Sequence, residues 1–111
     1  MNKLDEQFES AGFKYKQTHR EDIFAIYERK YINSTKDSHY ESIKIQSHNG
    51  MEIAGNKIPP SEYYPSSNSW GRHGYTCTTK KEAYTRLDRM MKEDVINKEA
   101  ANKKAERKNA K

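Results

Sequence analysis

Two kinds of hydrophobic spacing divide this chain, one typical of strands and one typical of helices. In residues 13–20 apolar or aromatic side chains alternate with charged ones, and this period of two predicts a half-exposed strand. Residues 22–32 are rich in β-branched and aromatic residues and predict a longer, central strand. In that strand Phe24 and Ile26 share one face, while Ala25 and Tyr27 share the other.

A third alternating segment, residues 39–48, predicts another strand with Ile43 and Ile45 on one face. Asn49-Gly50 follows directly, and both residues tolerate a positive φ, so the pair predicts a hairpin turn with a short return strand over residues 51–55. Beyond it the pattern loosens. Pro59, Pro60 and Pro65 lack a backbone N–H and exclude a regular central strand.

Helical spacing is expected at both ends of the chain. Leu4, Phe8 and Ala11 lie at i, i+4 and i+7, with Gly12 placed to end a short N-terminal helix. Residues 78–96 predict a long helix, in which Thr79 and Glu82 form a capping box. Its apolar stripe consists of Ala83, Tyr84, Leu87, Met90, Met91 and Val95.

These elements predict an α+β fold in which an antiparallel sheet of three or four strands packs against one long C-terminal helix. We expect a single compact domain over residues 1–97 and a basic helical or frayed tail over residues 98–111. The helix should cover the Ile and Phe face of the sheet, because such sheets bury one face and leave the other wet. The wet face would then carry Tyr27, Tyr40, Lys44 and Gln46.

Composition and charge narrow the possible partners. Only 32% of the 111 residues are hydrophobic, and eight of those are Tyr, so the core must be thin. The net charge is +5, but residues 98–111 hold six Lys or Arg against two Glu, so the rest of the chain is nearly neutral. A domain that binds duplex DNA usually concentrates its cations on one face. Outside the tail, the sequence has no such concentration.

The chain has little that supports catalysis or metal binding. Its one cysteine, Cys77, has no Cys or His neighbour at zinc-ligand spacing, and we expect it to be a buried strand residue. Nucleophile elbows, phosphate-binding Gly loops and metalloprotease helices are absent, and only His73, beside Arg72, invites a test as an acid or base. We therefore expect no enzymatic activity, no catalytic residue, no metal and no cofactor. With no apolar run of membrane or signal length, a cytoplasmic protein is expected.

The candidate contact surface is the segment "YYPSSNSWGRHGYTC", residues 63–77, which holds the only Trp of the chain. Trp, Tyr and Arg are favoured at binding hot spots, because they offer large rigid area and polar groups. The candidates for partner binding are Tyr63, Tyr64, Trp70, Arg72 and His73. A structural alternative also exists, in which Trp70, Gly71, Gly74 and Tyr75 join the sheet to the C-terminal helix.

The sequence pattern of residues 40–91 resembles that of another group of proteins. The run "IPPSEYYPSSNSWGRHGYTCTTKKEA" followed by an amphipathic helix resembles small uncharacterised accessory proteins of tailed bacteriophages, in which a "YPS", "WG" and Gly-aromatic segment precedes the terminal helix. The resemblance implies a product made in the cytoplasm of a bacterial host. It also implies action by binding a host enzyme, a defence component or nucleic acid.

Two functions remain open on the sequence. The first is a protein-binding modulator that docks through the aromatic segment and the sheet surface. The second is a nucleic-acid-binding module, in which loop aromatics stack on unpaired bases and the tail contacts phosphates. The residues for this alternative are Lys98, Lys103, Lys104, Arg107 and Lys108.

Overall fold

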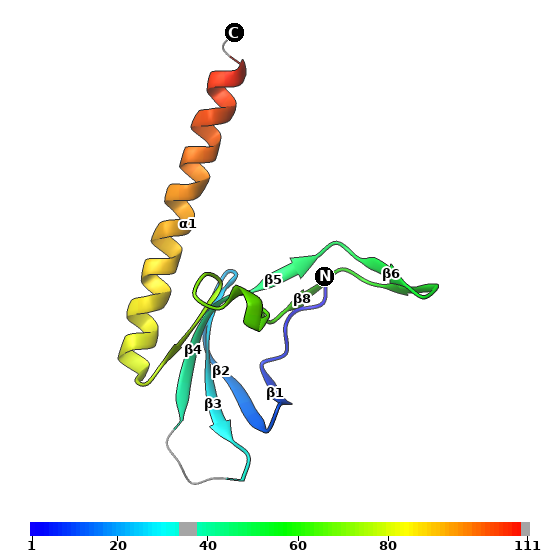
Figure 1. Cartoon of the computed structure of the whole chain (residues 1–111), viewed down its shortest axis with the longest axis vertical. Coiled ribbons are helices and arrows are strands. Elements are labelled where there is room, and N and C mark those ends of the chain that lie inside the picture. Colours follow the sequence, from blue (N-terminus) through cyan, green and yellow to red (C-terminus); the bar gives the residue numbers. More distant parts are fainter. Residues whose placement is uncertain (34–37, 110–111) are drawn as a thin grey trace.

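A five-stranded antiparallel sheet with one long helix along it forms the body of the protein (Figure 1). The computed structural model describes residues 1–33 and 38–109, with side chains through residue 101; most of the turn expected at 33–38 lies outside it. The strand order is β1-β2-β3-β4-β9. The strands are β1 (Gln7–Ser10), β2 (Phe13–Glu21), β3 (Phe24–Tyr31), β4 (His39–Lys44) and β9 (Gly74–Cys77). The predicted α+β class is confirmed, with more strands than expected.

The predicted N-terminal helix is wrong, because this segment forms strand β1 of a hairpin with β2. Ala11 and Gly12, at φ 51° and 82°, make the two-residue turn between Ser10 and Phe13. A spacing of four residues fits a strand face as well as a helix face, since four is an even number. Phe8 is held here by a contact across the hairpin, where its ring stacks on that of Tyr15 at 4.6 Å between centroids.

Residues 46–63 form a two-stranded arm that projects from the body (Figure 1). Its base pairs β5 (Gln46–His48) with β8 (Ser61–Tyr63), and its tip pairs β6 (Met51–Ile53) with β7 (Asn56–Ile58). The hairpin turn predicted at Asn49-Gly50 is wrong. The chain turns instead at Ala54-Gly55, where both φ values are positive (51° and 81°). Gly50 lies opposite the prolines, which interrupt the ladder between the two paired segments.

A half-buried ion pair holds the base of this arm to the sheet. Glu62 of β8 accepts two hydrogen bonds from the Arg20 guanidinium, at 2.9 and 2.7 Å, and a third from the backbone N–H of Leu4 at 2.9 Å. The N-terminal segment runs alongside β8, since the N–H groups of Asn2 and Glu62 donate to Pro60 and Asn2 respectively. The hydrogen bonds with Arg20 are the main reason that the pKa of Glu62 lies below its usual range.

The helix α1 (Lys80–Asn109) confirms the predicted C-terminal helix and its cap. The Thr79 hydroxyl accepts a hydrogen bond from the Glu82 N–H at 3.1 Å, and the Glu82 carboxylate reaches back to Thr78 rather than Thr79. Ala83, Leu87 and Met90 are buried, as expected, but Tyr84 and Val95 are 41% and 55% exposed. In the described residues no helix is long and apolar enough to cross a membrane.

Both faces of the central strands β3 and β4 are covered, so the wet face expected there is wrong. On the helix side, Phe24 and Ile26 pack with Cys77 of β9 and with residues of α1 such as Leu87. On the opposite side, Ala25, Tyr27, Ile43 and Ile45 form a second cluster. The register pairs Phe24 with Lys44 and Ala25 with Ile43, and residues paired across strands share a face. Ile43 and Ile45 therefore lie away from the helix, contrary to expectation.

Each residue assigned to the wet face has a partner instead. Tyr27 has no exposed surface, and its hydroxyl donates to the Asp5 carbonyl at 2.7 Å. Tyr40 packs against the helix-side cluster, and Lys44 forms a 2.7 Å ion pair with Asp94 of α1. Gln46 donates from its side chain to the Lys44 carbonyl. No flat tyrosine surface remains on this part of the sheet.

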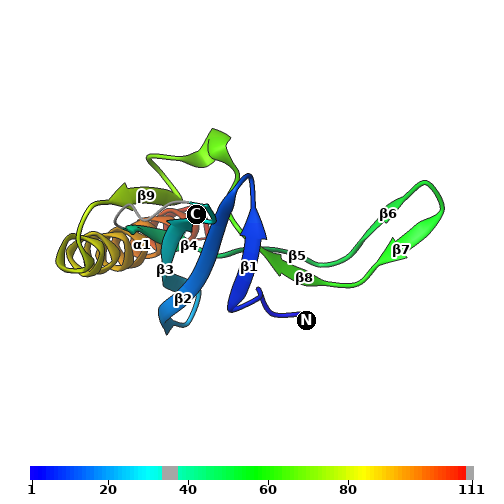
Figure 2. The same cartoon turned by 90° about the horizontal axis from the view of Figure 1, so that it is seen from below.

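The arm and the far half of the helix give the molecule an open shape. Figure 2 shows the strands side by side, with the helix on one side of the sheet and the arm reaching away on the other. The radius of gyration is 17.0 Å, whereas a compact domain of this length has about 13 Å.

We expect Glu62→Gln to loosen the base of the arm and to make stability less dependent on pH. Since the pKa of Glu62 is lowered on folding, its contribution is complete above the unfolded value and is lost as the pH falls through the lower folded value. At neutral pH the variant should lose about 1–3 kcal/mol of unfolding free energy, because a charged hydrogen-bonded pair is broken. Urea denaturation at about pH 7 and about pH 3 measures this, and an equal difference at both values would contradict it.

Candidate partner-binding groove

The two neighbouring tyrosines of the candidate segment point to different places. Tyr63 lies on the arm, is 45% exposed and stacks on His48 with 6.0 Å between ring centroids. Tyr64 turns inward and packs edge-on against Phe8 and Tyr27. Burial, followed by the nearby Glu41 carboxylate, raises the pKa of Tyr64 far above its usual value, so the hydroxyl stays protonated. Tyr64 is therefore half-buried and packs against the second cluster, with its hydroxyl turned inward.

The Tyr64 hydroxyl belongs to a buried polar network centred on Glu41 of β4. It donates to one Glu41 oxygen at 2.6 Å, while the Arg29 guanidinium donates to the other at 3.1 Å. The Thr76 hydroxyl, from β9, lies 3.4 Å from the same second oxygen. Glu41 is only 3% exposed, and a buried carboxylate is tolerated when such partners compensate for its lost hydration. The network ties the segment to three strands.

Trp70 closes this network at the edge of the sheet. A short turn, η1 (Ser67–Ser69), leads into it. The Trp70 ring lies against Gly74, where an added Cβ would come within 2.3 Å of the ring, and its indole N–H donates to the Thr76 hydroxyl at 3.0 Å. The ring also stacks beside Tyr64 at 6.4 Å between centroids. Trp70 is therefore half-buried at the sheet edge and packs against the second cluster, so that it joins the segment to the sheet rather than to the helix.

Arg72 and His73 lie on the outer side of the turn. The Arg72 Nε–H points to His73 Nε2 at 3.4 Å, and the His73 carbonyl accepts from the Lys44 N–H at 2.8 Å. Burial first, then the charges of Arg72 and Lys44, lowers the pKa of His73, so the ring is neutral at physiological pH. Both residues border a hollow of about 460 Å³ beside Met90, Asp94 and Asn97 of the helix.

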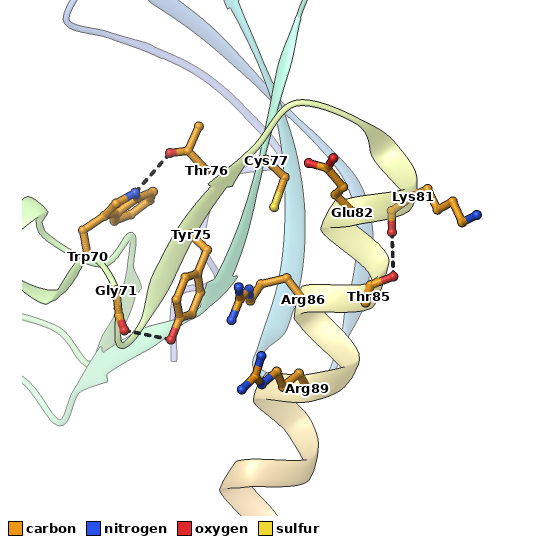
Figure 3. Close-up of a pocket in the computed structure, with 10 residues that line it drawn as sticks. All are labelled: Trp70, Gly71, Tyr75, Thr76, Cys77, Lys81, Glu82, Thr85, Arg86 and Arg89. Carbon is orange, nitrogen blue, oxygen red and sulfur yellow. Dashed lines mark hydrogen bonds between the residues drawn. The ribbon is translucent and has the colours of Figure 1, made fainter.

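A larger groove of about 660 Å³ lies between β9 and the first turns of α1 (Figure 3). Its floor includes Tyr75, whose hydroxyl donates to the Gly71 carbonyl at 2.7 Å, and Cys77. The guanidinium of Arg86 lies over the Tyr75 ring at 4.3 Å, and Arg86 and Arg89 both extend from the helix toward β9. The Lys81 side chain, on the rim, points away.

The electrostatic character of this groove is positive. Two guanidinium groups face into it, whereas the Glu82 carboxylate is already bound by the N–H and hydroxyl of Thr78. Arg89 also pairs with Glu93 of the next turn at 3.4 Å, an exposed pair of small strength. Guanidinium groups bind carboxylates and phosphates in bidentate geometry. The groove therefore suits an anionic group that approaches along the sheet edge.

The sequence predicted part of this surface and missed its charged wall. Trp70 lines the larger groove, Arg72 and His73 line the adjoining hollow, and Gly71 and Tyr75 border both. Arg86 and Arg89 were not predicted. The sequence does contain a signal for them. They are three residues apart, so they lie on the same side of the helix, beside the buried stripe of Ala83, Leu87 and Met90.

The alternative nucleic-acid residues lie apart from the groove. Lys98 pairs with Asp94 at 3.2 Å on the exposed helix. The helix continues through residues 103–108, but the side chains of Lys103, Lys104, Arg107 and Lys108 lie outside the described ones. Among the described residues no group of His, Cys, Asp or Glu side chains is arranged to hold a metal ion. Cys77 is buried, as expected, and burial raises the pKa of its thiol.

A double-mutant cycle tests the contact between Trp70 and Gly74. Gly74→Ala should cost about 1–3 kcal/mol of unfolding free energy, because the new methyl group overpacks against the Trp70 ring. In the background of Trp70→Ala the same substitution should cost much less, since the clash is removed. Urea denaturation of the four proteins measures the coupling, and additive losses would show that the ring does not rest on Gly74.

Comparison of the chain with models of protein families, with curated proteins and with solved structures found no match. The resemblance to phage accessory proteins therefore stays a prediction from the residues.

Proposed function

We propose that this chain is a small non-enzymatic binding protein that docks an acidic surface of another protein in the groove between β9 and α1. The observation that carries the proposal is the pair of guanidinium groups, Arg86 and Arg89, that face the aromatic floor of this groove. Aromatic residues and Arg are the types enriched at protein interfaces. The phage context remains part of the proposal, with a host or phage protein in the bacterial cytoplasm as the partner.

The proposed contact surface lies at the edge of the sheet, and not on the sheet face where it was expected. The tyrosines that were expected to lie on the sheet face, Tyr27 and Tyr40, are packed inside the fold. Tyr63 remains exposed on the arm, and Arg72 and His73 extend the surface along the helix. The groove thus replaces the sheet face as the place where side chains meet a partner.

The nucleic-acid alternative has one observation in its favour. The helix continues to Asn109, well past Asp94, which pairs with Lys44 of the sheet, and residues 98–111 carry most of the net charge. An exposed cationic helix binds phosphates without sequence preference and with strong salt dependence. In this alternative the tail, not the groove, holds the ligand.

Charge reversal separates the two functions. Arg86→Glu with Arg89→Glu should reduce capture of the partner from bacterial lysate by at least about tenfold, because two favourable charged contacts become repulsive. The matched control is Lys80→Glu with Lys92→Glu, which makes the same charge change at exposed positions of the same helix that do not line the groove. Circular dichroism checks that both variants remain folded.

Removal of residues 98–111 should leave capture intact, also after nuclease treatment of the lysate. If capture is lost with the tail or with nuclease, and salt weakens it steeply, the nucleic-acid function replaces the one proposed here. If the control variant loses as much as the groove variant, the groove is not the contact surface.

A further inference from the structure

The strand β9 is an edge of the sheet whose outward backbone groups can be identified. The Lys44 N–H donates to His73, and the Ile45 N–H donates to Ile23, so even-numbered residues of β4 bond toward β9 and odd-numbered ones toward β3. Pairs along an antiparallel ladder alternate between bonded and non-bonded. The N–H and C=O of Gly74 and Thr76 therefore point away from the sheet.

One of these two residues is already covered. The Gly74 carbonyl accepts a hydrogen bond from the Gly71 N–H at 2.8 Å, so residues 70 and 71 close that end of the edge. Thr76 is exposed, and its outward N–H and C=O lie where the groove begins. An edge strand with outward backbone groups is a template for pairing with another extended chain.

The side chains around Thr76 indicate which kind of chain fits. A strand added beside β9 would direct alternate side chains to the helix side of the sheet. On that side Arg86 and Arg89 extend toward β9 and hold positive charge over an aromatic floor. Acidic side chains at alternate positions would reach these guanidinium groups while the backbone pairs with Thr76.

We propose that an extended acidic segment of the partner protein adds to β9 as a sixth strand, bonding to the backbone of Thr76 and placing alternate carboxylates against Arg86 and Arg89. This inference rests on the proposed function and gives its binding mode, which is β-strand addition. Main-chain hydrogen bonds supply affinity in this mode, and the alternate side chains supply specificity.

The same geometry disfavours a nucleic acid in this groove. Stacking of bases requires an open aromatic face. One face of Tyr75 lies under the Arg86 guanidinium, and the Trp70 ring rests on Gly74 and is held by Thr76. The outward N–H and C=O groups of an edge strand match those of another extended polypeptide, because both backbones present donors and acceptors at the same spacing along the strand.

The test uses the full chain and a designed acidic peptide, acetyl-Thr-Glu-Val-Glu-Thr-Glu-Val-amide, with a version in which Lys replaces each Glu as the control. Thr76→Pro removes the outward N–H, and proline is tolerated on an edge strand where that group faces solvent. Thr76→Ala is the matched variant, because it also loses the hydroxyl but keeps the N–H. Amide NMR measures peptide binding and hydrogen exchange at Thr76.

We expect the acidic peptide to bind the wild-type chain, and to bind Thr76→Pro about tenfold or more weakly than Thr76→Ala, since both variants lack the hydroxyl and only the Pro variant loses the main-chain hydrogen bond. The Thr76 amide of the wild-type chain should exchange at least about tenfold more slowly when the peptide is bound. If Thr76→Pro does not fold, this hydrogen-exchange measurement on the wild-type chain tests the strand addition instead.

Several results would overturn the inference: no binding of the acidic peptide, equal binding of the Lys peptide or of a single-stranded oligothymidylate, unchanged Thr76 exchange, or equal binding to the Pro and Ala variants. Failure here is distinguishable from failure of the proposed function. If partner capture from lysate still depends on Arg86 and Arg89 but not on the Thr76 N–H, the groove binds its partner without strand addition. If it depends on neither, the proposed function fails too.

Discussion

The buried carboxylate of Glu41 is the constraint on which the rest of the fold depends. It lies on the central part of the sheet and is nearly without exposed surface, so it must be compensated by hydrogen bonds or positive charge. Arg29 comes from the next strand, Tyr64 from the segment after the arm, and Thr76 from the edge strand. Because these partners come from distant parts of the chain, satisfying one carboxylate also fixes how the segment after the arm crosses the sheet.

This crossing explains how a chain with few hydrophobic residues makes a stable sheet. The helix covers one face with a small apolar cluster, and the second cluster forms under the segment that Glu41 holds in place. Tyrosine provides much of this second cluster, since its ring is apolar and its hydroxyl can be satisfied locally. The Tyr27 hydroxyl, for example, donates to the Asp5 carbonyl and accepts from Gln17. The aromatic residues that appeared available for partners are therefore largely part of the core.

The proposed contact surface follows from what remains uncovered. The segment that closes the second face ends at Trp70 and Gly71, which cover the edge strand only as far as Gly74. The helix begins directly after this strand and cannot cover its edge, so a positive groove is left beside Thr76. The arm and the far half of the helix project away from the body and leave this edge open (Figures 1 and 2). An edge strand of this kind is usually protected in proteins that act alone.

The sequence by itself determined the elements whose signals are local. Alternation predicted the strands that became β2 and β4, and β-branched and aromatic content predicted β3. The capping box at Thr79 predicted where the C-terminal helix begins. The spacing of Leu4 and Phe8 fits both a helix and a strand, so it could not decide between them. Only the contact of Phe8 with Tyr15 across the hairpin selects the strand. The tertiary structure alone decided the rest. Which face each strand presents, the burial of Tyr64 and the meeting of Arg86 with Tyr75 depend on register and on long-range pairing, which no local pattern specifies.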